Sequence, residues 1–197
     1  MAAVRTGTVV AAGSSGLYVA GDGKFGGLAR SDDDGLTFAF VDDLASYTTG
    51  LQVLKSGHVL RFSGKISKSV DRGETWNNCS WLTTNLPIPE DADGRLYLIS
   101  GGQLRVSNDE GDSWTPLADS PGGSMLGALF VRDGRGRSYV PGIAKASDPV
   151  IYFKDDSTST WASFPAPPSP FVQRFAFDNR ERLLAATTAG VYRFDPE

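Results

Sequence analysis

The chain has 197 residues, of which 40% are hydrophobic and 21% charged, so it can bury a sizeable core and is predicted to form one folded domain. Its 19 basic and 23 acidic residues give a formal charge of −4, which excludes the strongly positive field that draws proteins to nucleic acid. Cys79 is the only cysteine and His58 the only histidine. The chain therefore has no pair for an internal disulfide and too few ligands for a Cys/His zinc cluster.

The N-terminal residues 1–7 precede an apolar patch that is too short for the hydrophobic region of a secretory signal peptide. No stretch of 18 apolar residues occurs, so no membrane insertion is expected. We expect cytoplasmic synthesis without a signal peptide, which agrees with the single thiol. A virion is a compatible destination, since cell lysis releases virus particles without such a signal.

Short apolar segments bounded by turn residues recur along the chain and predict β-strands. The first strand of each pair is expected at residues 8–10, 51–54, 86–88, 129–131 and 175–177, and the second at 16–20, 58–62, 94–99, 137–140 and 182–186. A third strand, a tight turn and a fourth strand follow, which makes a four-stranded antiparallel unit. The units span about 7–45, 46–83, 84–123, 124–169 and 170–197. The fifth unit stops at its third strand, 191–194, and residues 1–6 are expected to supply its missing edge.

One eight-residue pattern, Ser-x-Asp-x-Gly-x-Ser/Thr-Trp/Phe, forms the tight turn in three units. It starts at Ser31, Ser69 and Ser107, a constant spacing of 38 residues. A fourth, decayed copy at 154–161 keeps Asp156 and Trp161 but has lost the leading Ser and the Gly. The Ser and Asp side chains can accept from nearby backbone amides, and Gly supplies a positive φ. The closing aromatic is expected to be the first buried residue of the next strand.

This pattern resembles the Asp-box, or BNR repeat, found in the β-propellers of sialidases and many unrelated proteins. The resemblance implies an all-β fold, a small β-propeller with five four-stranded antiparallel blades in a single domain, 1–197, whose ring the N-terminal strand closes. It also implies structural roles for Ser31, Asp33, Gly35, Thr37, Ser69, Asp71, Gly73, Thr75, Trp76, Ser107, Asp109, Gly111, Ser113, Trp114, Asp156 and Trp161. The acidic turns lack the 12-residue ligand spacing of an EF-hand, so no metal or other cofactor is expected.

Propeller geometry places the turns between first and second strands, together with the Asp-box turns, at one end of the blades. The other end carries two irregular loops, 21–27 and 141–149, which would flank the fifth blade. We expect a binding groove there, because function concentrates in irregular loops. Its candidate binding residues, with two from neighbouring connections, are Lys24, Phe25, Tyr47, Trp81, Lys145 and Asp148. Exposed aromatic rings beside polar groups suit a sugar or a protein surface.

Enzymatic activity is not expected. Sialidases of this family use six blades, an arginine triad and a Tyr/Glu nucleophile pair, whereas this chain is too short for six such blades. Its arginines Arg30, Arg105 and Arg193 fall on third strands, away from the irregular end. A glycosidase also needs two carboxylates facing one cleft, and only Asp22 and Asp148 qualify.

The sequence therefore favours a non-catalytic binding or structural module that recognises a surface glycan or a partner protein. A tail, receptor-binding or decoration component of a phage or other virus particle, assembled with further subunits, fits this description. Two alternatives stay open: a divergent sialidase-like glycan hydrolase, and an intracellular assembly scaffold of the photosystem-factor type.

Overall fold

The computed structural model describes residues 9–21, 27–42, 48–80, 88–101, 103–117, 121, 124–125, 129–143, 148–155, 157–158, 160–167 and 172–194. Every regular element in these ranges is a β-strand. The described residues contain no helix with the length and apolar character that a membrane span requires.

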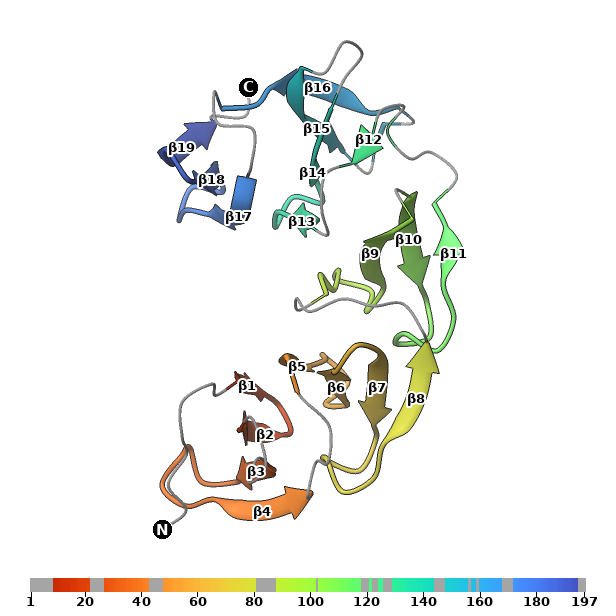
Figure 1. Ribbon diagram of the computed structural model, residues 1–197, viewed down its shortest axis with the longest axis vertical. Coiled ribbons are helices and arrows are strands. Elements are labelled where there is room, and N and C mark those ends of the chain that lie inside the picture. The colour runs from red at the N-terminus through yellow and green to blue at the C-terminus, as the bar shows by residue number, and fades with distance from the viewer. Residues whose placement is uncertain are drawn as a thin grey trace. The chain divides into compact units, whose positions relative to one another are not determined.

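The strands form five antiparallel sheets that follow one another along the chain (Figure 1). The first sheet consists of β1 (Val9–Gly13), β2 (Gly16–Ala20), β3 (Leu28–Ser31) and β4 (Ala39–Asp42). The second consists of β5 (Gly50–Val53), β6 (Val59–Phe62), β7 (Ile66–Ser69) and β8 (Asn77–Ser80). The third contains β9 (Leu96–Ser100), β10 (Gln103–Ser107) and β11 (Thr115–Pro116).

The fourth sheet contains β12 (Ser124–Met125), β13 (Val131–Arg132), β14 (Ser138–Ile143), β15 (Pro149–Lys154) and β16 (Ala162–Pro165). The fifth contains β17 (Val172–Phe177), β18 (Leu183–Thr187) and β19 (Gly190–Phe194). Each sheet lies within one of the five predicted units, and the strands pair in chain order within the first, second and fifth sheets. The all-β prediction is therefore confirmed.

The fourth sheet departs from the prediction at Pro141. Residues 141–143, predicted as loop, belong to β14, and Pro149 opens β15 rather than ending a loop. Along the edge of β14 that faces away from β15, β13 pairs with Ser138 and Tyr139, and β12 pairs with Gly142 and Ile143. The two short strands thus leave Pro141 unpaired on that side, as a residue without an N–H donor requires.

The chain divides into two compact units, one of residues 1–96 with 107–114 and the other of 97–106 with 115–197. In the first unit, Tyr18 and Leu28 from the first sheet pack with Leu51 and Val59 from the second. All four are almost fully buried, and Trp76 packs against them. Burial of each such side chain contributes about 1.5 to 3 kcal/mol, so this contact holds the two sheets together.

In the second unit, the fourth sheet is buried on both faces because successive residues of a strand point to opposite sides. One face packs on the third sheet, through Val140, Val150 and Tyr152 against Tyr97 and Leu104. The other face packs on the fifth sheet, where Tyr139 and Ile151 contact Leu183. This explains why these strands read as continuous apolar runs rather than as alternating patterns.

The proposed closure of a ring by the N-terminal strand rests on residues 1–6, which lie outside the described residues. Ring closure and the single five-bladed domain therefore stay predictions. Among the described residues the fifth sheet has three strands, and no fourth strand extends it.

The second turn packs so closely on the first sheet that only glycine fits. Gly73 has a φ of 95°, and a Cβ there would lie 2.7 Å from Leu28 Cδ2. We expect Gly73→Ala to lower the free energy of unfolding by about 2 to 4 kcal/mol, because backbone strain and overpacking add. Gly64 is the matched control, since its φ is 76° but nothing lies within 4 Å of its Cβ position. Urea denaturation should give a loss of only about 1 to 2 kcal/mol for Gly64→Ala, and equal losses would contradict the packing argument.

Candidate functional site

The three Ser-x-Asp-x-Gly turns share one hydrogen-bond network. In the second turn, the Ser69 hydroxyl donates to Asp71 at 2.8 Å and accepts from the Gly73 amide at 2.7 Å. The Asp71 carboxylate accepts from the Thr75 amide at 2.8 Å and from its hydroxyl at 2.5 Å. The turns at Ser31 and Ser107 repeat these contacts at 2.5 to 2.9 Å.

These hydrogen bonds occupy the carboxylates of the turns. Donation from Thr37 and Thr75 lowers the pKa of Asp33 and of Asp71 to about 2. At Asp109, burial opposes ionisation, but hydrogen bonds from Ser113 outweigh it and lower the pKa. The three carboxylates are therefore structural acceptors rather than proton donors at neutral pH.

The closing aromatic residue caps the turn instead of opening the next strand. The indole N–H groups of Trp76 and Trp114 donate at 3.0 Å to the carbonyls of Gly73 and Gly111. β8 and β11 start one residue after these tryptophans. The prediction that the aromatic residue is the first residue of the next strand was therefore wrong. In the decayed copy Thr158 replaces the glycine, and the buried Trp161 Nε1 has no hydrogen-bond partner among the described residues.

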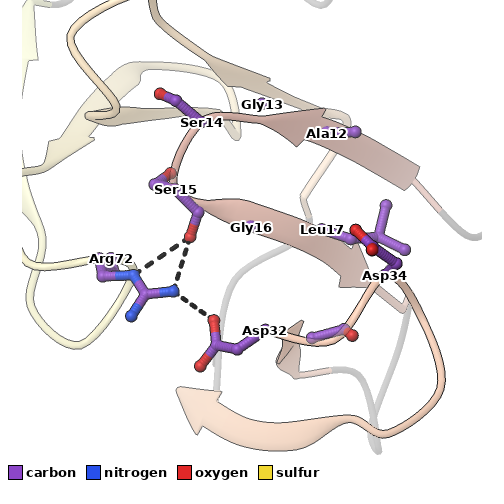
Figure 2. Close-up of a pocket in the computed structure, with 10 residues that line it drawn as sticks. Ala12, Gly13, Ser14, Ser15, Gly16, Leu17, Asp32, Asp34 and Arg72 are labelled. Atoms are coloured by element: carbon purple, nitrogen blue, oxygen red, sulfur yellow. Dashed lines mark hydrogen bonds and ion pairs between the residues drawn. The ribbon is translucent and has the colours of Figure 1, made fainter.

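The fourth position of the turn contacts the preceding sheet. Arg72, at a φ of 63°, donates from Nη2 and Nε to the Ser15 carbonyl at 2.9 and 3.1 Å and also contacts the Asp32 carboxylate (Figure 2). Arg30 donates to the same carboxylate and, at 3.0 Å, to the Arg72 carbonyl. This cluster fastens the second turn to the first sheet.

Glu110 makes the corresponding contact one repeat later. It lies 2.6 Å from His58 Nδ1, and Lys68 contacts Asp112 at 2.6 Å. Burial raises the pKa of Glu110, but hydrogen bonds from His58 and Ser56 and the charge of Lys68 outweigh it and lower the pKa. The single histidine of the chain thus joins a sheet to the next turn.

A polar cavity of about 280 Å³ lies where the β1–β2 hairpin meets the first turn (Figure 2). It is lined by Ala12, Gly13, Ser14, Ser15, Gly16, Leu17, Ser31, Asp32, Asp34 and Arg72. The charge of Asp32 is balanced by Arg30 and Arg72. Asp34, the fourth residue of the first turn, also lines the cavity and makes no hydrogen bond or ion pair with any described residue.

An apolar stripe runs from the first turn along β4. Its residues, Leu36, Phe38 and Phe40, are 85%, 42% and 64% exposed. Glu74 and Asp112 occupy the position of Leu36 in the other two turns, and Asn78 and Pro116 occupy that of Phe40. Sequence reasoning missed this stripe, although continuing the alignment of the three copies for two more residues reveals it.

The hydrogen bonds of a second repeated turn, which immediately precedes β9, β14 and β18, were also missed. Asp91, Asp133 and Asp178 each accept from the amides two and four residues later, at 2.8 to 3.0 Å. An arginine lies four residues after the aspartate in all three copies, and this repeated Asp–Arg spacing in the sequence could have revealed the turn.

The groove expected beside the fifth blade lies almost wholly outside the described residues. Lys24, Phe25, Tyr47, Trp81 and Lys145 are not described, nor is Asp156 of the decayed turn. Asp148 is exposed immediately before β15. The groove therefore stays a prediction. In the part of the chain that the structure describes, no group of three His, Cys, Asp or Glu side chains could hold a metal ion.

Neither a family model nor a curated protein sequence matches the chain. Solved structures do. YCF48 bound to a D1 peptide is 13% identical, with a TM-score of 0.66, and the alignment covers 94% of this chain and 64% of YCF48. The extracellular domain of the hybrid two-component system BT4673 from B. thetaiotaomicron is 10% identical, with a TM-score of 0.62 and coverage of 93% and 26%.

A gluconolactonase from Xanthomonas campestris, XC5397, is 15% identical, with a TM-score of 0.53 and coverage of 91% and 68%. The YCF48 and BT4673 structures are of the β-propeller type. The present fold is a β-propeller. At these identities the likeness establishes the fold alone, and the chain spans less than two thirds of the YCF48 structure. Each sheet is accordingly called a blade below.

The turn carboxylates predict the response of the protein to acid. Asp33 and Asp71 titrate at about 2 when folded and near 3.8 when unfolded, so their contribution to stability is complete above about pH 4 and is lost as the pH falls to about 2. We expect the melting temperature to fall steeply between pH 4 and pH 2. Asp71→Asn should lower it by about 2 to 8 °C at pH 7 and reduce the acid-induced fall. Calorimetry across this range checks both effects, and an undiminished fall in the variant would contradict the assignment.

Proposed function

We propose that this β-propeller is a non-catalytic module that binds a partner protein through the apolar stripe of its first blade. The observation that carries the proposal is the pair of exposed apolar residues Leu36 and Phe40 in one repeat of three, where the other repeats carry acidic residues at the first position and Asn or Pro at the second. The side chains of Leu36 and Phe40 make none of the hydrogen bonds of the turn, and exposed apolar side chains lower solubility. Their presence therefore needs an explanation other than the stability of the turn. Contact with a protein surface supplies one.

The chemistry of the turns supports a binding role over catalysis. The carboxylates of Asp33, Asp71 and Asp109 hold the backbone and are ionised. Burial raises the pKa of the Cys79 thiol to about 12, which keeps it protonated and a poor nucleophile. The hydrogen bonds of the three turns also support their assignment to the Asp-box class, in which repeats build a scaffold and leave variable positions for contacts.

Propellers of this type hold peptides in at least one case, since YCF48 has been solved with a D1 peptide. This precedent supports a protein partner and an assembly role for the present chain. Membership of a phage or virus particle, and glycan binding at the groove beside the fifth blade, remain proposals that rest on the sequence.

The test uses a random-dodecapeptide display library selected on the immobilised wild-type protein. Leu36→Glu combined with Phe40→Asn installs the residues of the second blade, and anisotropy titrations measure the affinities of the enriched peptides. We expect at least a tenfold loss, since buried apolar anchors commonly dominate binding. The melting temperature should not fall, because both side chains are exposed.

Val191→Thr is the matched control, because Val191 is 71% exposed but belongs to β19 of the fifth sheet and not to the stripe. It should leave the affinities within twofold of wild type. Failure to enrich any peptide, or equal affinities for wild type and the double variant, would overturn the proposal.

A further inference from the structure

The edge of the first blade offers more than an apolar surface. Resting on the proposed function, we infer that β4 binds an extended segment of the partner as an added β-strand, and that a Lys or Arg at one end of this segment pairs with Asp34. The partner is thus a strand with alternating apolar side chains and a basic terminus. Three features of the blade support this mode.

The first feature is the open edge of β4. This strand pairs only with β3 among the described strands. Ala39 and Phe40 lie opposite Arg30 and Ala29, and after a register shift at Val41 the pairing resumes at Asp42. Its outer backbone groups have no strand partner among the described residues. β4 contains no proline, and it lies at the margin of the sheet (Figure 1). The corresponding strand of the third blade, β11, ends in Pro116, which cannot donate a hydrogen bond. An open edge without such protection is suited to strand addition.

The second feature is the spacing of the apolar side chains. Phe38 immediately precedes β4 and Phe40 lies on it, and alternate residues of an extended chain share a face. Leu36 lies in the turn just before them. The five residues from Phe38 to the end of β4 at Asp42 span at most about 13 Å, which matches an added segment of similar length. All three side chains are exposed, so an added strand can cover them without rearrangement of the core.

The third feature is charge. Asp34 lies two residues before Leu36, so the two Cα atoms are at most about 7 Å apart. It lines the cavity next to Leu17 and is the carboxylate there without an arginine partner (Figure 2). An added strand that runs along β4 therefore ends near a carboxylate that has no ion-pair partner among the described residues, and a basic side chain complements it.

The probes are blocked seven-residue peptides whose affinities are measured by titration followed by NMR. The first is Lys-Thr-Val-Thr-Val-Thr-Lys, which presents a base in either strand direction, and the second replaces both Lys by Glu. Two further versions carry N-methyl groups on one or the other alternating set of amides. Strand addition uses a single set, so we expect one isomer to bind at least tenfold more weakly than the other.

Protein variants separate the two parts of the inference. Asp34→Asn keeps a residue that tolerates the observed φ of 57° and should reduce the preference for the Lys peptide over the Glu peptide from at least tenfold to about twofold or less. Glu74→Gln, which changes an exposed carboxylate of the second turn, should leave the preference unchanged. Phe40→Asn should weaken both peptides.

The outcomes distinguish this inference from the proposed function. Suppose that the display-selected peptides need Leu36 and Phe40. If the Lys and Glu probes then bind with equal affinity, or if the two N-methyl isomers bind with equal affinity, strand addition with a basic terminus is wrong while protein binding stands. Absence of Lys-peptide binding at 1 mM, or binding of an oligosaccharide at this edge instead, also overturns the inference. If Phe40→Asn weakens the binding of no peptide, both the proposed function and this inference are wrong.

Discussion

The carboxylate of the repeated turn is the interaction on which the structure depends. Asp71 ties its own backbone position to both the amide and the hydroxyl of Thr75, while Ser69 holds the Gly73 amide. Together they reverse the chain between the third and fourth strands without help from distant residues. They also set the positive φ at the fourth position, from which Arg72 and Glu110 reach back to the preceding blade. A local hydrogen-bond network thereby sets both the hairpin and the contact between neighbouring blades.

The same network separates the positions that hold the fold from those that are free to make contacts. The Ser, Asp and Gly of each turn make the same hydrogen bonds in all three copies, whereas the residues at the fourth, sixth and tenth positions differ from copy to copy. In the second and third turns the fourth position fastens one blade to another. In the first turn this position is Asp34, which makes no hydrogen bond or ion pair with a described residue, and the sixth and tenth are Leu36 and Phe40. The proposed binding edge thus belongs to the repeat in which these variable residues are available to contact a partner.

Much of the fold could be predicted from the sequence, since its signals are local. The turns at Ser31, Ser69 and Ser107 and the short apolar segments placed the five sheets, and an all-β propeller followed from their order. The prediction failed at residues 141–143, because their strand conformation depends on β12 and β13 pairing on either side of Pro141. The groove inferred from loop irregularity lies almost wholly outside the described residues and stays a prediction. The cavity beside the first turn was not predicted, because its lining comes from the β1–β2 hairpin, the first turn and Arg72 of the second turn, which only the fold brings together.

The sequence by itself determined the repeat, the turn chemistry and the strand order, because a Ser, an Asp and a Gly at fixed spacing act on a backbone within five residues. Only the tertiary structure decided which side chains are covered. Trp76 and Phe38 occupy equivalent positions, yet Trp76 packs on the Tyr18 cluster and Phe38 is exposed. It likewise decided that Arg72 neutralises Asp32 and leaves Asp34 without a counter-ion. Exposure and charge balance depend on residues about forty positions apart, and their proximity is set by the packing of blades rather than by any local pattern.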